Sequence, residues 1–309
     1  MTKNSHIKQA ILATLNFYDL FDFPLTNFEI FDNLWRCRAE NSDVFACLDE
    51  LKLHKSINFS EGFYFLPGRE QIVSIRQKRY LDSFHKKQQL IREKWLFSLA
   101  PFVDNVAIAN TLAYSNAKQQ GDIDILVVTR PGRIFTARIF LTFWLLMFNR
   151  WRHGQSVKNK YCLSFFLSSD NLDLSRLKFP DTDDIYLSYW TKWLTPYYCT
   201  DKKAEETYFQ NNSWIKTNLP NTNFFNTNLY QDQKSYFARF FELLLHGGLG
   251  DVLEKILHQM MLYKIKNKTK EFHIDGTIAS DQILKFHPNG KRREYEQKWL
   301  KQIKNPGNL

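Results

Sequence analysis

The chain has 309 residues, with 42 Lys and Arg against 32 Asp and Glu, a formal net charge of +10, and 44% apolar residues. This length provides for two or three domains with cores of their own, and the composition excludes a largely disordered chain. The four cysteines lack C-x-x-C spacing and nearby paired histidines, which argues against a zinc site or a disulfide framework. We therefore expect a globular protein of a reducing cytoplasm.

Residues 1–67 carry the pattern of a winged-helix-like unit. The apolar residues of IKQAILATLNFYDLF have helical spacing and predict a first helix. A second helix is predicted to begin at the capping-box pair Thr26 and Glu29, and a third at an N-cap at Ser42. Two short strands then surround a turn at residues 60–62. The exposed face of the third helix carries acids that phosphates would repel, which argues against DNA binding by this unit. Those acids are Asp43, Asp49 and Glu50.

Residues 68–100 are predicted to form a long, charged helix that connects this unit to the next. Within residues 101–178, the segments NVAIA, DIDILVVT and YCLSFFLS are predicted strands, and GRIFTARIFLTFWLLMFN between the last two is a predicted crossover helix. This order indicates a small α/β core with a mixed sheet. Residues 179–309 are predicted to be a helical region with no further strand. The predicted fold class is therefore α+β.

The most apolar window of the chain is IFTARIFLTFWLLMF, residues 134–148. It contains Arg138 and is shorter than the roughly 20 residues that are needed to span a bilayer. We interpret it as a buried helix. Contact with a membrane surface is the less favoured alternative, suggested by Arg150 and Arg152 next to the window.

Asp122 and Asp124 stand one residue apart where the apolar run ILVV begins. Because side chains alternate along a strand, the two carboxylates point to the same face and can bind one cation. Magnesium prefers one or two protein carboxylates together with phosphate oxygens and water, so the pair predicts a magnesium site. The structural alternative is that Asp122 caps the turn after Gly121 while Asp124 pairs with a neighbouring arginine.

The turn AIANTLA and the pair of aspartates that follows it resemble the nucleotidyltransferase superfamily related to DNA polymerase β, over about residues 103–172. The resemblance implies that Asp122 and Asp124 are catalytic and hold two magnesium ions. It also implies that Asn110 and Thr111 bind the nucleotide, at the place of the Gly-Ser turn of that superfamily. Asparagine tolerates the left-handed backbone that glycine would adopt, and threonine keeps the hydroxyl group, so the turn can still bind phosphate.

Active members of that superfamily carry a third carboxylate on the following strand, and YCLSFFLS contains none. Ser164 occupies a plausible position, and Asp170 comes only after the far end of the strand. Asp170 is therefore the candidate third catalytic carboxylate. Lys118, Arg130 and Arg133 are the candidates for neutralising the triphosphate, since arginine binds phosphate in a bidentate manner.

The whole chain also resembles a group of uncharacterised bacterial proteins. These join a winged-helix-like N-terminus, here FYDLFDFPLT and GFYFLPGRE, to a nucleotidyltransferase domain, and they end near an FHP element, here Phe286-His287-Pro288. This second resemblance supports the order of domains and implies no particular acceptor.

Two main functions remain open on the sequence, and a membrane-surface protein that uses residues 134–152 is a third, less favoured one. The first is a magnesium-dependent nucleotidyltransferase that moves a nucleoside monophosphate from a triphosphate to the hydroxyl group of a protein, an RNA or a small molecule. The second is a nucleotidyltransferase fold that has lost catalysis and binds a nucleotide or RNA, because no acid lies between Asp124 and Asp170 while seven Lys or Arg do.

Overall fold

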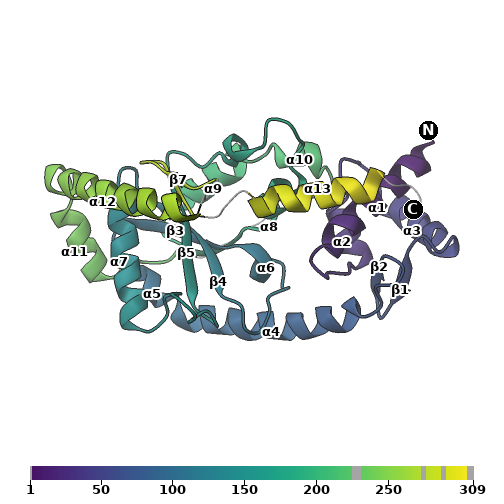
Figure 1. Ribbon diagram of the computed structural model, residues 1–309, viewed down its shortest axis with the longest axis horizontal. Helices are drawn as coiled ribbons and strands as arrows, with labels where there is room; N and C mark the ends of the chain where they lie inside the picture. The colour runs from purple at the N-terminus through teal and green to yellow at the C-terminus, as the bar shows by residue number, and fades with distance from the viewer. Residues whose placement is uncertain (1, 225–230, 273–275, 287–289, 305–309) are drawn as a thin grey trace.

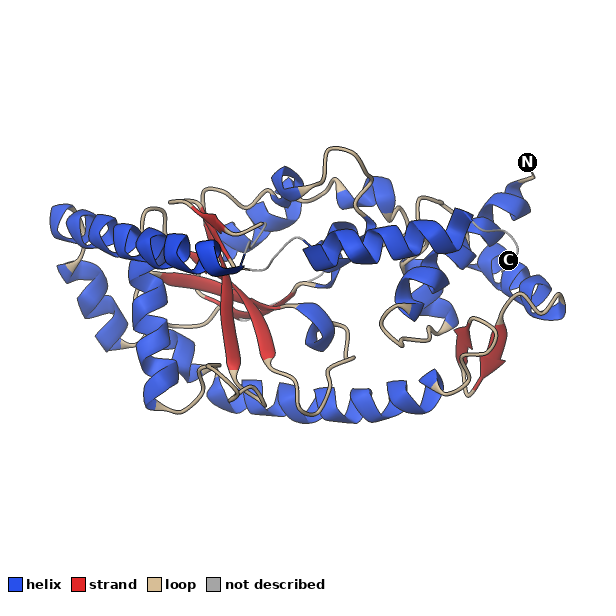
Figure 2. Cartoon of the chain, in the orientation of Figure 1, coloured by secondary structure: helices blue, strands red, loops and turns tan. Residues whose placement is uncertain are grey.

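The computed structural model describes residues 2–224, 231–272, 276–286 and 290–304. It is a mixed α and β protein, in which a sheet and its covering helices lie beside a helical N-terminal unit (Figures 1 and 2). The predicted α+β class is therefore confirmed. His287 and Pro288 of the FHP element lie outside the described residues.

The N-terminal unit consists of three helices and a hairpin, in the predicted order. The helices are α1 (Lys3–Asp19), α2 (Asn27–Asp32) and α3 (Asn41–Leu53), and the hairpin pairs β1 (Asn58–Ser60) with β2 (Phe63–Phe65). The capping box at α2 is present, since the backbone N–H of Thr26 donates to Glu29 Oε2 at 2.9 Å. The predicted N-cap at Ser42 is wrong by two positions, because α3 begins at Asn41 and its N-cap is Glu40.

A six-stranded sheet in the order β6-β3-β4-β5-β8-β7 forms the centre of the second part. Its inner strands are β3 (Val103–Ile108), β4 (Ile123–Thr129) and β5 (Tyr161–Ser168). Strands β4 and β5 are parallel, and α7 (Ile134–Met147) provides the crossover that a parallel pair requires. The other neighbours pair in antiparallel fashion. The mixed sheet and its crossover helix match the expectation for residues 101–178.

The prediction of a purely helical region after residue 178 is wrong. Three strands of the sheet come from it: β6 (Thr195–Cys199), β7 (Ile278–Ala279) and β8 (Ile283–Lys285). They were missed because each is short, and because β6 contains Pro196, which is tolerated on an edge strand and hides its period of two. The sheet therefore extends on both sides beyond the strands of residues 101–178.

The remaining helices connect and cover these parts. Helix α4 (Ile72–Glu93) runs along the lower side of Figure 1 from the hairpin to the sheet, and α5 (Trp95–Ser98) follows it. The others are the short α6 (Asn110–Ala113), the 3₁₀ turn at Leu174–Leu177, α8 (Ile185–Trp193), α9 (Lys202–Asn211), α10 (Ile215–Asn218), α11 (Tyr236–Leu244), α12 (Gly248–Phe272) and α13 (Gly290–Lys304).

The hydrophobic core of the N-terminal unit includes residues from the far end of the chain. Ile185 and Tyr189 of α8 and Trp299 of α13 are buried in the same cluster as the apolar faces of α1 and α3. Helix α13 thus lies against α1 (Figure 1). The C-terminal segments therefore join the sheet to the N-terminal unit.

Helix α7 is buried on one side only, which corrects its interpretation as a buried helix. Its inward residues, among them Leu141 and Leu145, belong to the core beneath the sheet. Its outward side exposes Ile139, Phe143 and Met147, at 46%, 49% and 58% of their surface. Among the described residues, none of the helices combines the length and apolarity that crossing a bilayer would demand.

Candidate metal and phosphate site

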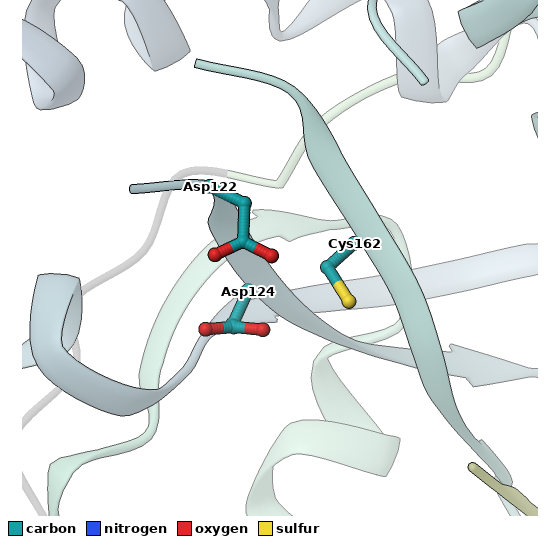
Figure 3. A group of neighbouring side chains, drawn as sticks. All are labelled: Asp122, Asp124 and Cys162. Atoms are coloured by element: carbon teal, nitrogen blue, oxygen red, sulfur yellow. The ribbon is translucent and has the colours of Figure 1, made fainter. Parts of the chain in front are cut away.

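The two aspartates lie together on one face of the sheet (Figure 3). Asp122 immediately precedes β4, Asp124 is its second residue, and Cys162 of β5 stands opposite Asp124 in the parallel register. Carboxylate oxygens of both aspartates and the Sγ of Cys162 lie within 4.8 Å of one another. This group of three could hold a metal ion, and the pairing expected from D-x-D on a strand is present.

The turn between β3 and α6 is next to the aspartates. Asn110 adopts a φ of +53°, the left-handed conformation that asparagine tolerates better than most residues. The backbone N–H of Ala109 donates to the carbonyl oxygen of Asp124 at 2.9 Å, and the Asn110 side chain hydrogen-bonds to Asp124. The Nε1 of Trp190 donates to Asn110 Oδ1 at 2.8 Å, which ties the turn to α8. The turn is therefore fixed from two sides.

Burial and charge repulsion act together on Asp124. Desolvation is the larger cause and the neighbouring charge of Asp122 the second, and they raise the pKa of Asp124 to about 6. Arg152 opposes this effect: its Nη1 lies 3.0 Å from Asp122 Oδ2 and donates to Cys162 Sγ at 3.4 Å. One guanidinium therefore compensates part of the charge of two crowded carboxylates. A bound cation would supply the rest.

A cavity of about 640 Å³ opens beside the pair, between the sheet, α8, α13 and α1. This volume is in the usual range for a small-molecule site, which is about 300–1,000 Å³. Asp122, Asp124 and Thr111 line it, so the Arg152 contact leaves the pair accessible. Aromatic side chains form much of its wall, and they include Tyr18, Phe21, Tyr114, Tyr186, Trp190 and Tyr295.

Besides Arg152, three cations line the same cavity: Lys285 at the end of β8, and Lys291 and Arg292 of α13. Lys285 is only 9% exposed, and burial lowers its pKa to about 8. Arg292 is already compensated, since its Nε donates to Asp184 Oδ1 at 3.0 Å. Lys285 and the exposed Lys291 line the cavity with Asp122 and Asp124, where an anionic ligand would meet them.

Three of the predicted residues lie at the opposite end of the sheet. Strands β4 and β5 both run away from Asp122, over a length of roughly 20 Å at about 3.3 Å per residue. Arg130 and Arg133 follow β4 and pair there with Glu242 and Asp251, at 3.3 and 2.8 Å. Asp170 follows β5 at the same end, as an exposed residue.

These three assignments to the site are therefore corrected. Asp170 cannot supply the third carboxylate from its position, nor can the two arginines reach a phosphate held at Asp122 and Asp124. Lys118 lies in the exposed loop before Gly121 and is not among the residues that line the cavity. Asn110 and Thr111 do line it together with the aspartates.

Sequence reasoning missed three residues of the site. Cys162 was set aside because it lacks a cysteine partner, although its place as second residue of YCLSFFLS puts it beside Asp124 once the strands are paired in parallel. Arg152 was noted only as part of the basic stretch and as a neighbour of the apolar window 134–148. Lys285 lies on β8, a three-residue strand that no periodic pattern indicates.

Comparison of the chain with protein-family models, with curated proteins and with solved structures finds no match.

Proposed function

We propose that the chain binds a nucleoside triphosphate and a divalent cation in this cavity and transfers the nucleoside monophosphate to a hydroxyl group. The observation that carries the proposal is the arrangement of Asp122 and Asp124 on one face, beside the Asn110 turn and a cavity of about 640 Å³. Magnesium requires hard oxygen ligands, which here would come from the two carboxylates and from the phosphates of a nucleotide in the cavity. The donor set therefore fits the predicted ion.

Asp122 and Asp124 would hold magnesium, which supplies charge stabilisation to the triphosphate when it is bound. Thr111 and the backbone of its turn are placed to contact phosphate oxygens, and Lys285 and Lys291 to neutralise them. In the transfer, the acceptor oxygen bonds to the α-phosphorus, the bond from that phosphorus to the β-phosphate oxygen breaks, and pyrophosphate leaves. The hydroxyl proton goes to solvent water.

The aromatic wall suits the remaining parts of the ligands. Tyr186 and Tyr295 stack with ring centroids 5.7 Å apart and planes at 3°, and Phe165 stacks on Trp190 at 5.4 Å. Flat rings at a cavity surface provide stacking partners for a nucleobase, at about 1–3 kcal/mol per base. Because these rings belong to α8 and α13 as well as the sheet, the C-terminal helices take part in the proposed site.

A second candidate is nucleotide binding without transfer. Its support is the absence of a carboxylate opposite Asp124, where Cys162 stands, together with the Arg152 contact that partly replaces a cation. Both candidates use the same cavity and the same phosphate contacts. They differ only in whether pyrophosphate is released.

Calorimetric titration with each nucleoside triphosphate, with and without magnesium, tests the binding step. We expect magnesium-dependent binding that the double change Asp122→Asn and Asp124→Asn weakens at least about tenfold, or 1.4 kcal/mol. Asp170→Asn is the matched control, because it removes an acid at the far end of β5 and should bind as the unchanged chain does. Binding that survives the double change would remove the metal pair from the proposal.

Release of pyrophosphate then separates the two candidates. The chain is incubated with labelled nucleotides, magnesium and a cell lysate, and label transfer to protein, RNA or small molecules is followed. Transfer that is lost in the double variant supports the enzyme. Binding without transfer or pyrophosphate in any fraction supports the binding protein.

A further inference from the structure

A second hollow lies between α4 and the loop that joins α7 to β5. Its volume is about 580 Å³, which is again in the range of small-molecule sites. Figure 1 shows the region, where the lower ends of β4 and β5 approach α4. None of the described residues that line the hollow also lines the cavity of the proposed site. We call it the basic hollow, after its four cations Lys86, Arg92, Arg150 and Lys158.

Lys86 is the buried cation of the basic hollow, with only 3% of its surface exposed. Its Nζ donates to the carbonyl oxygen of Gly121 at 2.7 Å and to Asn159 Oδ1 at 2.5 Å. Both acceptors are neutral, and they use two of the three donors of the ammonium group. Burial lowers the pKa of Lys86, against the attraction of the more distant Asp122 and Asp82. Because buried charges are normally paired, an anion in the hollow would complete the surroundings of this lysine.

Glu93 lines the hollow but does not compensate Lys86, because its carboxylate is engaged elsewhere. Its Oε1 pairs with Arg150 Nη2 at 2.5 Å. Its Oε2 accepts from the hydroxyl of Tyr161 and from Gln89 Nε2, each at 3.0 Å. The charges of Glu93 and Arg150 therefore cancel each other.

The remaining charges make the hollow positive. Arg92 and Lys158 are exposed, and neither forms an ion pair with another residue that the structure describes. Asp82 is the remaining acid of the described lining. Lys86, Arg92 and Lys158 against this one acid leave two positive charges in excess, which attract an anion.

The lining favours a phosphate group over a nucleobase. None of its described residues is Phe, Tyr or Trp, so a base would have no such ring to stack on. Lysine and arginine side chains are the usual donors to phosphate oxygens. The side-chain amide of Gln119, which is exposed at the rim, offers a further donor.

We propose that the basic hollow binds a phosphate group and is a second anion site, separate from the triphosphate of the proposed transfer. The phosphate can belong to a phosphorylated small molecule or to the backbone of an RNA, since both present the same oxygens. The hollow adjoins the carboxylate pair, because Lys86 contacts Gly121 and the next residue, Asp122, lines the cavity. The two sites share no described side chain, so loss of one activity does not imply loss of the other.

Calorimetric titration of the full chain without magnesium tests the proposal. Inorganic phosphate and a single-stranded RNA of about ten nucleotides are used as separate ligands. We expect binding that weakens as salt is added, and that the double change Arg92→Glu and Lys158→Glu weakens at least about tenfold. Both side chains are exposed, so circular dichroism should show an intact fold. Binding of inorganic phosphate assigns the hollow to small phosphorylated molecules, and binding of RNA alone assigns it to an RNA backbone.

The double change Lys202→Glu and Lys203→Glu is the matched control. It changes the net charge by the same amount at two exposed lysines of α9, which line neither the hollow nor the cavity, and it should leave binding unchanged. Lys86→Met removes the buried ammonium group and should also weaken binding. Affinity that is retained in the Arg92 and Lys158 double variant or in folded Lys86→Met, an equal loss in the control, or no binding of either ligand overturns the proposal.

Discussion

Cys162 occupies the position from which a third carboxylate would complete the acidic site. It faces Asp124 across the parallel β4–β5 pair, and its Sγ donates to Ser164 Oγ at 3.3 Å. Burial is the main cause that raises its pKa, so the group is a neutral thiol near neutral pH. A neutral thiol adds no charge to the pair. In the proposed site, magnesium would therefore be held by two carboxylates without a third.

The change Cys162→Asp should increase magnesium-dependent transfer. A third carboxylate beside Asp124 adds a hard oxygen ligand and strengthens magnesium binding. We expect the magnesium concentration for half-maximal activity to fall and the turnover rate to rise at least about tenfold, or 1.4 kcal/mol of activation free energy. Both are measured by release of pyrophosphate.

Cys162→Asn is the control for that change, since it introduces a polar group of the same size without charge. An equal gain in Cys162→Asn would mean that space or polarity, rather than the added carboxylate, limits the unchanged chain. No gain in either variant would show that the position opposite Asp124 is not where a third ligand acts.

The pKa values of two buried groups, Asp124 and Lys285, should set the pH range of nucleotide binding. The pKa of Asp124 is raised to about 6, so below that pH a proton competes with the metal for the carboxylate. The pKa of Lys285 is lowered to about 8, so above that pH its amine is neutral and no longer attracts phosphate. Magnesium-dependent nucleotide affinity should therefore be highest between about pH 6 and 8, as measured by calorimetry across that range.

Lys285→Arg separates the two limbs of this profile. Arginine stays charged to above pH 12, so the decline on the alkaline side should disappear while the acidic side is unchanged. An alkaline decline that is the same in Lys285→Arg would assign that limb to another group.

At the level of the elements, Glu254 explains how α12 is fixed to the crossover helix α7. Its carboxylate caps the N-terminus of α7: Oε1 accepts from the N–H of Phe135 at 2.8 Å, and Oε2 from the N–H and Oγ1 of Thr136 at 2.8 and 2.6 Å. The first turn of a helix leaves such N–H groups without partners, and a carboxylate is favoured there. One side chain thus joins a helix near the end of the chain to the crossover helix.

Glu254→Ala should lower the free energy of unfolding by about 1–3 kcal/mol, since it leaves two buried backbone donors unsatisfied. Urea denaturation of the full chain measures this loss. Glu254→Gln keeps an acceptor oxygen and should recover part of it. Equal stability of the alanine variant and the unchanged chain would mean that water replaces the carboxylate at no cost.

The parts of the fold that could be predicted are those in which a periodic pattern is long enough to read. The helices of residues 1–67 and strands β3, β4 and β5 follow such patterns, and the D-x-D spacing placed Asp122 and Asp124 on one face. Strands β6, β7 and β8 have two to five residues, too few for a period to appear. Lys285 was missed with them, because its place in the site depends on which strand pairs with β5.

At the level of the whole molecule, α13 connects the cavity to the N-terminal unit. Its Tyr295 stacks on Tyr186 in the cavity wall, while Trp299, further along the helix, is buried against Trp35 with ring centroids 5.7 Å apart. The Nε1 of Trp299 donates to the carbonyl oxygen of Ala13 in α1 at 2.8 Å. The N-terminal unit therefore supports one wall of the site through this helix.

Trp299→Ala should lower both the stability of the N-terminal unit and the affinity of the cavity for a nucleotide. Removing a large buried ring costs about 3–5 kcal/mol, and the lost contact is the one that holds α13 to α1. We expect a lower melting temperature, faster hydrogen exchange in α1, and a nucleotide affinity reduced because Tyr295 and Lys291 are no longer held at the cavity. Trp144→Ala provides the comparison, since Trp144 is a partly buried tryptophan of α7 that donates to the carbonyl oxygen of Leu99 at 3.2 Å and does not line the cavity. If α1 exchanges faster while nucleotide affinity stays the same, the N-terminal unit does not support the site, and the cavity depends on the sheet and α8 alone.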